Sequence, residues 1–263
     1  MTTKMKELVL HQVYKTASIV EEAIEIGIPL IFKNKKTSLE TQKSTAINFH
    51  KHTLLHHYIK YCFLMDNENL FCERPEDVIE GVFELEFLRS QFSQYNIDID
   101  FLEIKYDEDD YPKTTKSRVF NWYKLNKKKF ELLSEKICDD IFYILFSNRI
   151  LLQQFNIIIS RDFDKFNFSN NELTTNGKIK RVRIPKWVRK AVYHRDKGRC
   201  VICTTDLSGV INTLETENFD HIVPLDLFGV NDPTNIQLLC KKCNLEKLNR
   251  NTNSSSIYEH WFD

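Results

Sequence analysis

The chain has 263 residues, enough for two ordinary domains, and its 42% hydrophobic and 28% charged composition is typical of a protein that buries a core. This composition excludes disorder as the main state. No apolar run reaches the roughly 18 to 20 residues that cross a bilayer, and the first residues lack the apolar stretch of a secretory signal. We therefore expect a cytoplasmic protein without a membrane segment.

The charges are distributed unevenly along the chain. Its 37 Lys and Arg residues balance its 37 Asp and Glu residues, so the net charge is +0. Between residues 178 and 199, however, ten Lys and Arg side chains stand against the single acid Asp196, while acids gather in residues 73–86 and 97–110. The neutral sum therefore does not exclude nucleic acid as a partner, because the basic segment can contact phosphates by itself.

Residues 1–166 predict a mostly helical region, because apolar residues recur at helical spacing and only Gly27 and Gly81 interrupt them. One short segment differs: Ile97–Tyr106 alternates apolar and acidic residues, which predicts an isolated strand. The predicted helices are Thr3–Ile26, Ser38–Met65, Pro75–Gln94 and Ser117–Phe155. For the last of these, two helices separated by one break are the alternative.

A polar segment separates this helical region from the C-terminal part of the chain. Residues 167–178, NFSNNELTTNGK, contain almost no large apolar side chain and are rich in Asn, Ser and Thr, a composition typical of a linker. We therefore expect three parts: a helical domain over 1–166 that recognises a target or binds a partner, a linker over 167–180, and a second domain over 181–263.

Seven cysteines in a reducing compartment need an explanation other than disulfides. Cys62, Cys72 and Cys138 lie in apolar helical segments and are expected to be small core residues. The other four form two CxxC pairs, the spacing of a tetrahedral zinc site that has no open position for a substrate. We expect one structural Zn²⁺ ion held by Cys200, Cys203, Cys240 and Cys243.

A second group of polar residues lies between and beside the two cysteine pairs. Asp220 and His221 are followed by Asn235 and then by Asn244. Together with the lead-in PKWVRKAVYHRDKGRCVIC and the segments FDHIVPL and NIQLLCKKCNLEK, these residues resemble the HNH, or ββα-metal, endonuclease family. The resemblance covers about a quarter of the chain, Ile184–Arg250.

The resemblance implies an α+β fold class, with a mostly α-helical N-terminal domain and a small C-terminal ββα-metal domain with a structural zinc. A two-stranded hairpin and a helix would surround one catalytic ion, Mg²⁺ or Mn²⁺. His221 would be the general base, since a neutral imidazole accepts a proton from water near pH 7. Asp220 and Asn244 would offer the hard oxygen ligands that such an ion prefers. Asn235 would orient His221 through a hydrogen bond.

The chain departs from the family pattern at two places. Asn244 stands where many members have His, a variant that is also found in active DNA nucleases and that suits a hard ion. After Pro224, where a Ser and a Gly pair are usual, Asp226 and Phe228 stand instead, and only Gly229 remains. Asp226 is interpreted as a solvated loop residue, with an extra acid near the metal as the alternative.

The cations before the first cysteine pair lie on or beside a helix that is expected to begin near Pro185, because proline is favoured in the first turn. Beside a nuclease site this concentration favours phosphate contact over a merely solvated surface. Lys247, on the expected last helix, is interpreted in the same two ways, as a phosphate contact or as an exposed helix lysine. The predicted nucleic-acid contacts are Arg183, Lys186, Arg189, Lys190, Arg195 and Lys247.

Four histidines gather in residues 49–58, FHKHTLLHHY, where His52 and His56 are one helical turn apart. No nearby carboxylate completes a metal-binding motif. A polar helix face or a partner surface is therefore the prediction, and a second metal site is the alternative.

The leading hypothesis is a metal-dependent enzyme that hydrolyses phosphodiester bonds in double-stranded DNA. Bacterial restriction or anti-phage defence is its expected setting, by analogy with other chains that join an HNH module to a recognition domain. One alternative is a zinc-stabilised module that binds nucleic acid without cutting it. Another is a nuclease subunit that is silent until a partner protein activates it. A protein partner or self-association is expected through residues 1–166.

Overall fold

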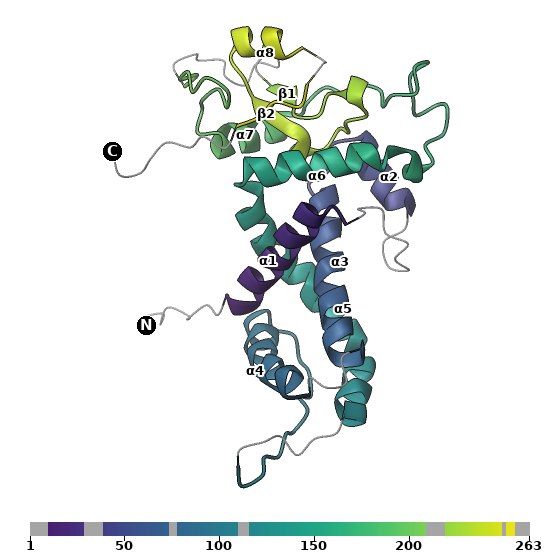
Figure 1. Cartoon of the computed structure of the whole chain (residues 1–263), viewed down its shortest axis with the longest axis vertical. Coiled ribbons are helices and arrows are strands. Elements are labelled where there is room, and N and C mark those ends of the chain that lie inside the picture. Colours follow the sequence, from purple (N-terminus) through teal and green to yellow (C-terminus); the bar gives the residue numbers. More distant parts are fainter. Residues whose placement is uncertain are drawn as a thin grey trace. The chain divides into compact units, whose positions relative to one another are not determined.

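The computed structural model describes residues 10–28, 39–73, 78–109, 116–208, 219–248 and 251–255, without the side chains of residues 72–73, 78–84, 86 and 116. These residues are mostly helical, with a two-stranded sheet near the C-terminal end of the chain (Figure 1), which confirms the predicted fold class. The chain divides into two compact units: the first comprises Met1–Val20 and Ile59–Phe142, and the second comprises Glu21–Tyr58 and Tyr143–Asp263.

Helices that pack around aromatic side chains build the first unit. The elements that contribute to it are α1 (His11–Ile26), α3 (Leu54–Glu68), the short π-helix η1 (Asn69–Glu73), α4 (Val78–Gln94) and α5 (Lys116–Phe146). Their core is a group of buried rings whose centroids lie 4.9 to 6.3 Å apart, a spacing typical of tilted and edge-to-face contacts. These rings belong to Phe71, Phe92, Trp122, Tyr123 and Phe130.

The ends of two predicted helices agree with the structure. Helix α1 ends at Ile26 and α4 ends at Gln94, as predicted, whereas their predicted starts lie outside the described residues. Two of the cysteines predicted to be core residues, Cys62 and Cys138, are buried. The third, Cys72, lies outside the residues whose side chains are described.

The predicted long helix Ser117–Phe155 is broken once. Helix α5 ends at Phe146, and α6 (Arg149–Arg161) follows it. The side chain of Asn148 accepts the backbone N–H of Leu151 at 3.1 Å, which satisfies a donor that the first turn of a helix leaves unpaired. Asn148 is therefore the residue that starts the second helix.

The predicted helix Ser38–Met65 consists of two helices, α2 (Leu39–Ile47) and α3. Thr53 and His56 form the boundary: the His56 N–H donates to Thr53 Oγ1 at 3.4 Å, and the Thr53 N–H donates to His56 Nδ1 at 3.0 Å. This arrangement is a capping box in which an imidazole replaces the usual Glu. The single-helix prediction was wrong because histidine is not part of the usual capping signature.

The predicted strand Ile97–Tyr106 does not form, and residues 97–105 are a loop. Side chains of α5 donate to backbone carbonyl groups that would pair with a neighbouring strand. Trp122 Nε1–H donates to Asp100 O at 2.7 Å, and Lys129 Nζ donates to Asp98 O at 2.7 Å. Ile97 is buried, while Asp98 and Asp100 are exposed. The alternation of apolar and acidic residues therefore reflects a loop that packs Ile97 into the core and leaves Asp98 and Asp100 exposed.

The second unit contains the sheet and the elements around it. Strands β1 (Phe219–His221) and β2 (Ile236–Leu238) are antiparallel, with Asp220 opposite Gln237 and His221 opposite Ile236. The helix after this hairpin is α8, so the hairpin and helix that the resemblance implied are present (Figure 1). The surrounding elements are α6, η2 (Phe163–Phe166), α7 (Lys186–Arg195), η4 (Leu225–Leu227), η5 (Pro233–Asn235) and α8 (Lys241–Lys247).

Helix α7 packs on β2 and closes the apolar core of the hairpin. Val188 and Val192 lie four residues apart on one face of α7, and both are fully buried. They share one core with Phe219 of β1 and with Ile236 and Leu238 of β2. The apolar residues of the hairpin are therefore held against α7, and its polar residues take no part in this packing.

The division into two units differs from the predicted limits of 1–166, 167–180 and 181–263. Residues 21–58 and 143–166 belong to the same unit as the hairpin. The predicted linker also lies in this unit, where Leu173 and Ile179 form an isolated antiparallel bridge. The three-part division stays a prediction.

Among the described helices, none is by itself long and apolar enough to span a membrane. The bent pair Ser117–Phe146 and Arg149–Arg161 meets the length and composition test only when its two helices are taken together.

Candidate active site and metal centre

The two CxxC pairs meet in the folded chain. The Sγ atoms of Cys200, Cys203, Cys240 and Cys243 all lie within 4.8 Å of one another, and those of Cys203 and Cys240 are 3.7 Å apart. Four thiolates at these separations suit tetrahedral zinc, whose bonds to sulfur are about 2.3 Å long. The residues therefore fit the predicted structural zinc site.

The ionisation of these thiols depends on their surroundings. Burial raises the pKa of Cys200 and of Cys243. The hydroxyl of Thr205, 3.1 Å from Cys203 Sγ, lowers the pKa of that more exposed thiol to about 6. A cation bound at the centre favours the thiolate form of all four ligands, because metal binding and loss of the thiol proton are coupled.

Hydrogen bonds connect the cysteine cluster to the end of β2 and to the start of α8. The Val201 N–H donates to Leu238 O at 3.0 Å, which links the first cysteine turn to the end of β2. Cys240 is the N-cap of α8, and its Sγ accepts the Cys243 N–H at 3.4 Å. A thiolate at this position is favoured by the positive end of the helix dipole. The cysteine cluster therefore determines where α8 begins.

A buried ion pair joins β1 to α8. Lys247 Nζ lies 2.8 Å from Asp220 Oδ2, and it donates to His221 O at 2.8 Å. The Lys247 side chain is 0% exposed and that of Asp220 is 14% exposed. Asn244 stands one turn before Lys247 on α8, so the two residues share a helix face. The fold therefore brings the Asp220 carboxylate to the helix face that carries Asn244.

His221 follows Asp220 and has a buried imidazole, only 1% exposed. Burial lowers the pKa of the ring to about 3, and the charges of Arg181 and Lys247 also lower it, whereas a hydrogen-bonding contact with Asn231 opposes the shift. The ring is therefore neutral near pH 7, the form that a general base needs. Neither ring nitrogen forms a hydrogen bond of good geometry.

Asn235 does not bond to the imidazole of His221, so the predicted hydrogen bond between them is not formed. Its Oδ1 accepts the Val223 N–H at 2.8 Å, and its Nδ2 donates to Val223 O and Val230 O, both at 3.0 Å. Both polar atoms of the Asn235 amide, Oδ1 and Nδ2, thus bond to the backbone of the loop after β1. Asn235 holds the two ends of this loop together.

The loop after β1 is tight where this chain departs from the family pattern. A Cβ at Gly229 would lie 1.9 Å from Val223 O, so only glycine fits there. Phe228 adopts a left-handed φ of 63°, which is uncommon for a residue with a Cβ, and its ring packs 5.1 Å from that of Phe163. Asp226 is exposed on η4, in agreement with its interpretation as a solvated residue.

Four of the predicted phosphate-contacting cations lie at or near the surface. Arg183, Lys186 and Lys190 are exposed, and Arg189 is half-buried. All four lie on or just before α7, the helix predicted to begin near Pro185. Their contact with nucleic acid stays a prediction.

The other two predicted contacts, Arg195 and Lys247, are buried in ion pairs. Arg195 Nε and Nη2 donate to the two carboxylate oxygens of Asp196 at 2.8 and 2.9 Å, and its side chain is 1% exposed. Asp196 Oδ2 also accepts the Leu238 N–H at 2.9 Å. In this arrangement both cations hold the hairpin rather than face solvent, Arg195 through Asp196 and Lys247 through Asp220.

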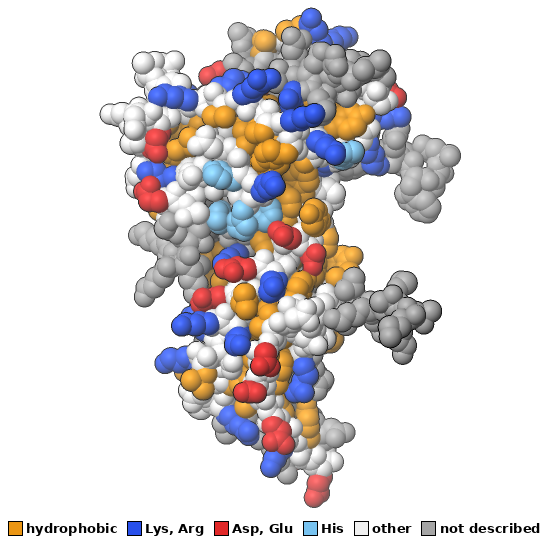
Figure 2. Space-filling view, turned by 180° about the vertical axis from the view of Figure 1, so that it is seen from behind, with side chains coloured by type: hydrophobic (Ala, Val, Ile, Leu, Met, Phe, Trp, Pro, Cys, Tyr) orange, Lys and Arg blue, Asp and Glu red, His pale blue; other side chains and the backbone are white. Residues whose placement is uncertain are grey.

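The predicted histidine cluster forms at the start of α3, and histidine side chains gather in one patch of the surface in Figure 2. The ring of His52 lies 4.7 Å from the rings of His56 and His57. His56 Nδ1 bonds to Thr53, and His57 Nε2 lies 3.5 Å from Thr45 Oγ1. In the part of the chain that is described, only the four cysteines form a group of three or more side chains placed to hold a metal ion.

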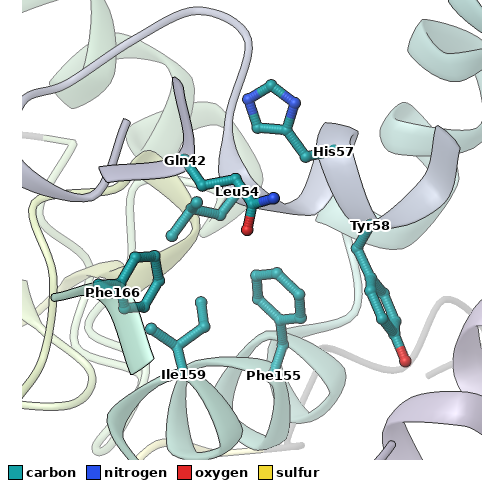
Figure 3. Close-up of a pocket in the computed structure, with 7 residues that line it drawn as sticks. All are labelled: Gln42, Leu54, His57, Tyr58, Phe155, Ile159 and Phe166. Carbon is teal, nitrogen blue, oxygen red and sulfur yellow. The ribbon is translucent and has the colours of Figure 1, made fainter. Parts of the chain in front are cut away.

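A small cavity of about 10 Å³ lies between α2, α3, α6 and η2 (Figure 3). Its lining is mostly apolar, with Leu54, Phe155 and Ile159 around it, and the amide of Gln42 points into it. The volume has room for about one water molecule. No residue of the hairpin lines it, so it does not extend the candidate active site.

Three polar residues of the second unit were absent from the predicted site. Asn231 and Arg181 act in opposite directions on the pKa of His221, and Asp232 Oδ2 accepts the Leu54 N–H at 2.9 Å. The sequence signals only a turn at Asn231 and Asp232, before Pro233. Their partners could not be found from the sequence, because Leu54 and Asp232 are 178 positions apart.

The comparisons with known proteins concern the same segment. The family model of the HNH endonucleases matches residues 200–250, about a fifth of the chain. No curated protein and no solved structure matches the chain significantly. The matched segment contains both cysteine pairs, both strands and α8, and the family supports a nuclease or nucleic-acid-acting function. Residues 200–250 of this chain are therefore similar to the HNH endonuclease family.

Proposed function

We propose that the chain is a metal-dependent endonuclease that hydrolyses phosphodiester bonds in double-stranded DNA. The observation that carries the proposal is the ion pair between Asp220 and Lys247, because it ties β1 to the face of α8 that bears Asn244. His221 follows Asp220 directly, so the base and both oxygen ligands belong to one hairpin and the helix after it. A fold that only binds nucleic acid does not need this combination.

Each residue of the site has one task in this proposal. Asp220 and Asn244 would hold Mg²⁺ or Mn²⁺, which neutralises charge on the phosphate and on the departing 3′ oxygen. His221 takes a proton from the attacking water. Asn235 keeps the loop after β1 in place through its bonds to Val223 and Val230. The four cysteines, with zinc, position α8.

Cations near the hairpin supply the contact with DNA. Arg181 is exposed and its charge reaches the imidazole of His221, so it is suited to contact the phosphate next to the reaction centre. Arg183, Lys186 and Lys190 continue this basic surface along the chain toward and over α7. Because such contacts release counterions from DNA, the affinity should fall steeply with salt.

A second candidate function is a nuclease subunit that is silent until a partner activates it. The burial of His221 favours it, because an imidazole that is 1% exposed reaches a phosphodiester only after a rearrangement. Asp220 is engaged by Lys247 in the same arrangement. Under this hypothesis, a protein bound to the helical region within residues 1–166 would supply the rearrangement.

A plasmid-cleavage assay tests the proposal. The full chain, with zinc confirmed, is incubated with supercoiled DNA in Mg²⁺, in Mn²⁺ and in EDTA, beside His221→Ala and Asn244→Ala. We expect metal-dependent nicking or linearisation by the wild type and its loss in both variants. Lys242→Ala is the matched control, because Lys242 is 82% exposed on the same helix and should leave cleavage unchanged. DNA that is bound but never cut would support the non-cleaving module.

We also propose that the nuclease acts in the cytoplasm of bacteria in restriction or anti-phage defence, with the helical region recognising a target or a partner. This setting rests on the analogy with other HNH modules joined to recognition domains. Plating of phages on cells that express the chain tests it. Protection by the wild type and its loss with His221→Ala is the expected result, and equal plating on both would contradict it.

A further inference from the structure

We infer that residues 251–255, which follow α8, clamp the C-terminal end of this helix, with Gln237 as the positioning residue that joins them to β2. We call this segment the clamp. The inference deepens the proposed function and rests on it, because β1 and α8 carry the proposed metal ligands Asp220 and Asn244. The zinc centre holds the start of α8, and the clamp holds its other end.

An asparagine connects the clamp to the last turn of α8. Asn251 Nδ2 donates to Lys247 O at 3.2 Å, and this carbonyl group belongs to the turn that has no acceptor partners inside the helix. Asn251 Oδ1 accepts the Asn253 N–H at 3.1 Å. Lys247 is also the residue whose ammonium group lies 2.8 Å from Asp220 Oδ2. The clamp is therefore bonded to the residue that joins α8 to β1.

Side chains of β2 and α6 bind the clamp by its backbone. Each of them donates to one carbonyl group of the clamp, at 2.5 to 3.1 Å: Gln153 to Thr252, Gln237 to Asn253 and Arg149 to Ser255. Gln237 is 0% exposed and Arg149 is 5% exposed, so water competes little for these bonds. Because the acceptors are main-chain oxygens, the contact depends on the path of the chain rather than on the side chains of the clamp.

Gln237 lies on the same face of the hairpin as Asp220. The register places the two residues directly opposite each other, and opposite residues of an antiparallel pair share one face of the sheet. Phe219 and Leu238 belong to the other face, which packs on α7. Lys247 contacts Asp220 and the clamp contacts Gln237, so α8 and the clamp meet the same face. A shift of the clamp therefore acts next to Asp220.

Arg149 connects the clamp to a second point on the hairpin. Besides the bond from its Nε to Ser255 O, its Nη1 lies 3.9 Å from Asp196 Oδ1. Asp196 Oδ2 accepts the Leu238 N–H at 2.9 Å, at the end of β2. Gln153 follows Arg149 by one helical turn, so both donors lie on one face of α6. Helix α6 is therefore the common support of the clamp and of β2.

Helix α8 depends on such support because it is short. It has 7 residues, and isolated helices of fewer than about 12 to 15 residues are marginal in water. Cys240 holds its first turn through the zinc centre, and the clamp holds the turn of Lys247. Without the clamp, the last turn should unwind more often, and Asn244 should lose its fixed position relative to Asp220.

Hydrogen exchange measures the clamp directly, with neither DNA nor a catalytic metal ion present. The zinc-loaded full chain is compared by mass spectrometry with Gln237→Leu and Gln153→Leu, which each remove one donor and nearly preserve the side-chain volume. We expect the amides of α8 to exchange about tenfold faster in both variants, the effect typical of one lost hydrogen bond, with α5 and the zinc content unchanged. Gln154→Leu is the matched control, because Gln154 is exposed beside Gln153 on the same helix.

Three outcomes of the exchange measurement would overturn the inference. Wild-type exchange of α8 in both donor variants would show that the clamp does not hold the helix. Equal acceleration in α5 would indicate general destabilisation, and equal acceleration of α8 in Gln154→Leu would show that the lost bond is not the cause. Should Gln237→Leu fail to fold, Gln153→Leu decides alone, because Gln153 is only half-buried.

Cleavage kinetics separate positioning from a merely structural role. We expect Gln237→Leu to need about 10- to 100-fold more Mg²⁺ for half-maximal cleavage, the size typical of a residue that orients metal ligands, with KM for DNA changed less than about twofold. Faster cleavage by the variant than by the wild type would show that the clamp covers the site, and would overturn the inference. Failure of the proposed function is distinct, because the wild type would then cleave no DNA while the exchange of α8 still decides whether the clamp holds the helix.

Discussion

The ammonium group of Lys247 lies 2.8 Å from Oδ2 of Asp220, and the lysine side chain is completely buried. Removing one partner of a buried ion pair leaves the other charge without compensation, which costs about 3 to 5 kcal/mol. We expect Lys247→Met to lower the free energy of unfolding by about 3 kcal/mol in urea denaturation. Lys242→Met, at an exposed position of the same helix, should change it by less than about 0.5 kcal/mol. Equal effects of the two variants would contradict the ion pair.

The link between the zinc centre and the catalytic residues predicts the behaviour of Cys240→Ser. Cys240 caps α8, and the helix carries Asn244 on its next turn. Without the ion the helix start is no longer fixed, and a displacement of about 1 Å can cost on the order of a hundredfold in rate. We expect the variant to lose zinc by elemental analysis and to lose cleavage even in excess Mg²⁺. A zinc-free variant that cleaves at the wild-type rate would disprove the coupling.

The predicted cations Arg195 and Lys190 should behave in opposite ways. Arg195 holds the buried carboxylate of Asp196, so Arg195→Ala should destabilise the fold by about 3 kcal/mol or more. Lys190 is exposed, so Lys190→Ala should leave stability unchanged within about 0.5 kcal/mol.

Measurements of DNA binding distinguish Lys190 from Arg195 further. In fluorescence-anisotropy titrations with a duplex, Lys190→Ala should weaken binding and reduce the slope of log K against log salt by about 0.9 per lost phosphate contact. An unchanged slope would remove Lys190 from the DNA-binding surface. A folded Arg195→Ala with wild-type stability would instead return Arg195 to the candidates for phosphate contact.

The burial of His56 predicts a loss of stability in acid. Burial lowers the pKa of His56 from 6.5 to about 3, and the neighbouring His52 and His57 add to the shift. Between pH 6.5 and 3 the unfolded chain binds a proton that the folded chain does not, so stability falls as the pH falls. From pH 7 to pH 5 this residue should cost about 2 kcal/mol.

The variant His56→Gln measures this contribution, because Gln can still accept the Thr53 N–H and does not titrate. Its free energy of unfolding should fall less than that of the wild type between pH 7 and pH 5, by about 2 kcal/mol. Parallel pH dependence of the two proteins would show that His56 is already protonated in the folded state or equally perturbed in the unfolded chain.

Local spacing explains the parts of the fold that could be predicted. Two CxxC pairs give four thiolates on two short turns, and these turns bring the sulfur atoms together once the hairpin between them forms. The position of Asn244 on the helix after Cys243, and the helical character of α1, α4 and α5, also follow from residues that are neighbours in the sequence. Contacts over a few positions depend little on the rest of the chain.

The sequence by itself therefore determined the HNH segment and its cysteine cluster, and it named Asp220, His221 and Asn244, whose roles stay predictions. Only the tertiary structure decided that Lys247 and Arg195 face the carboxylates of Asp220 and Asp196, and that Asn235 bonds to the backbone of the loop after β1 rather than to His221. A cation or an amide has the same local pattern whether its partner is a phosphate, a carboxylate or a backbone carbonyl. The choice depends on which distant segment packs against it, and for Asn231 that segment is the end of α2, 184 positions away.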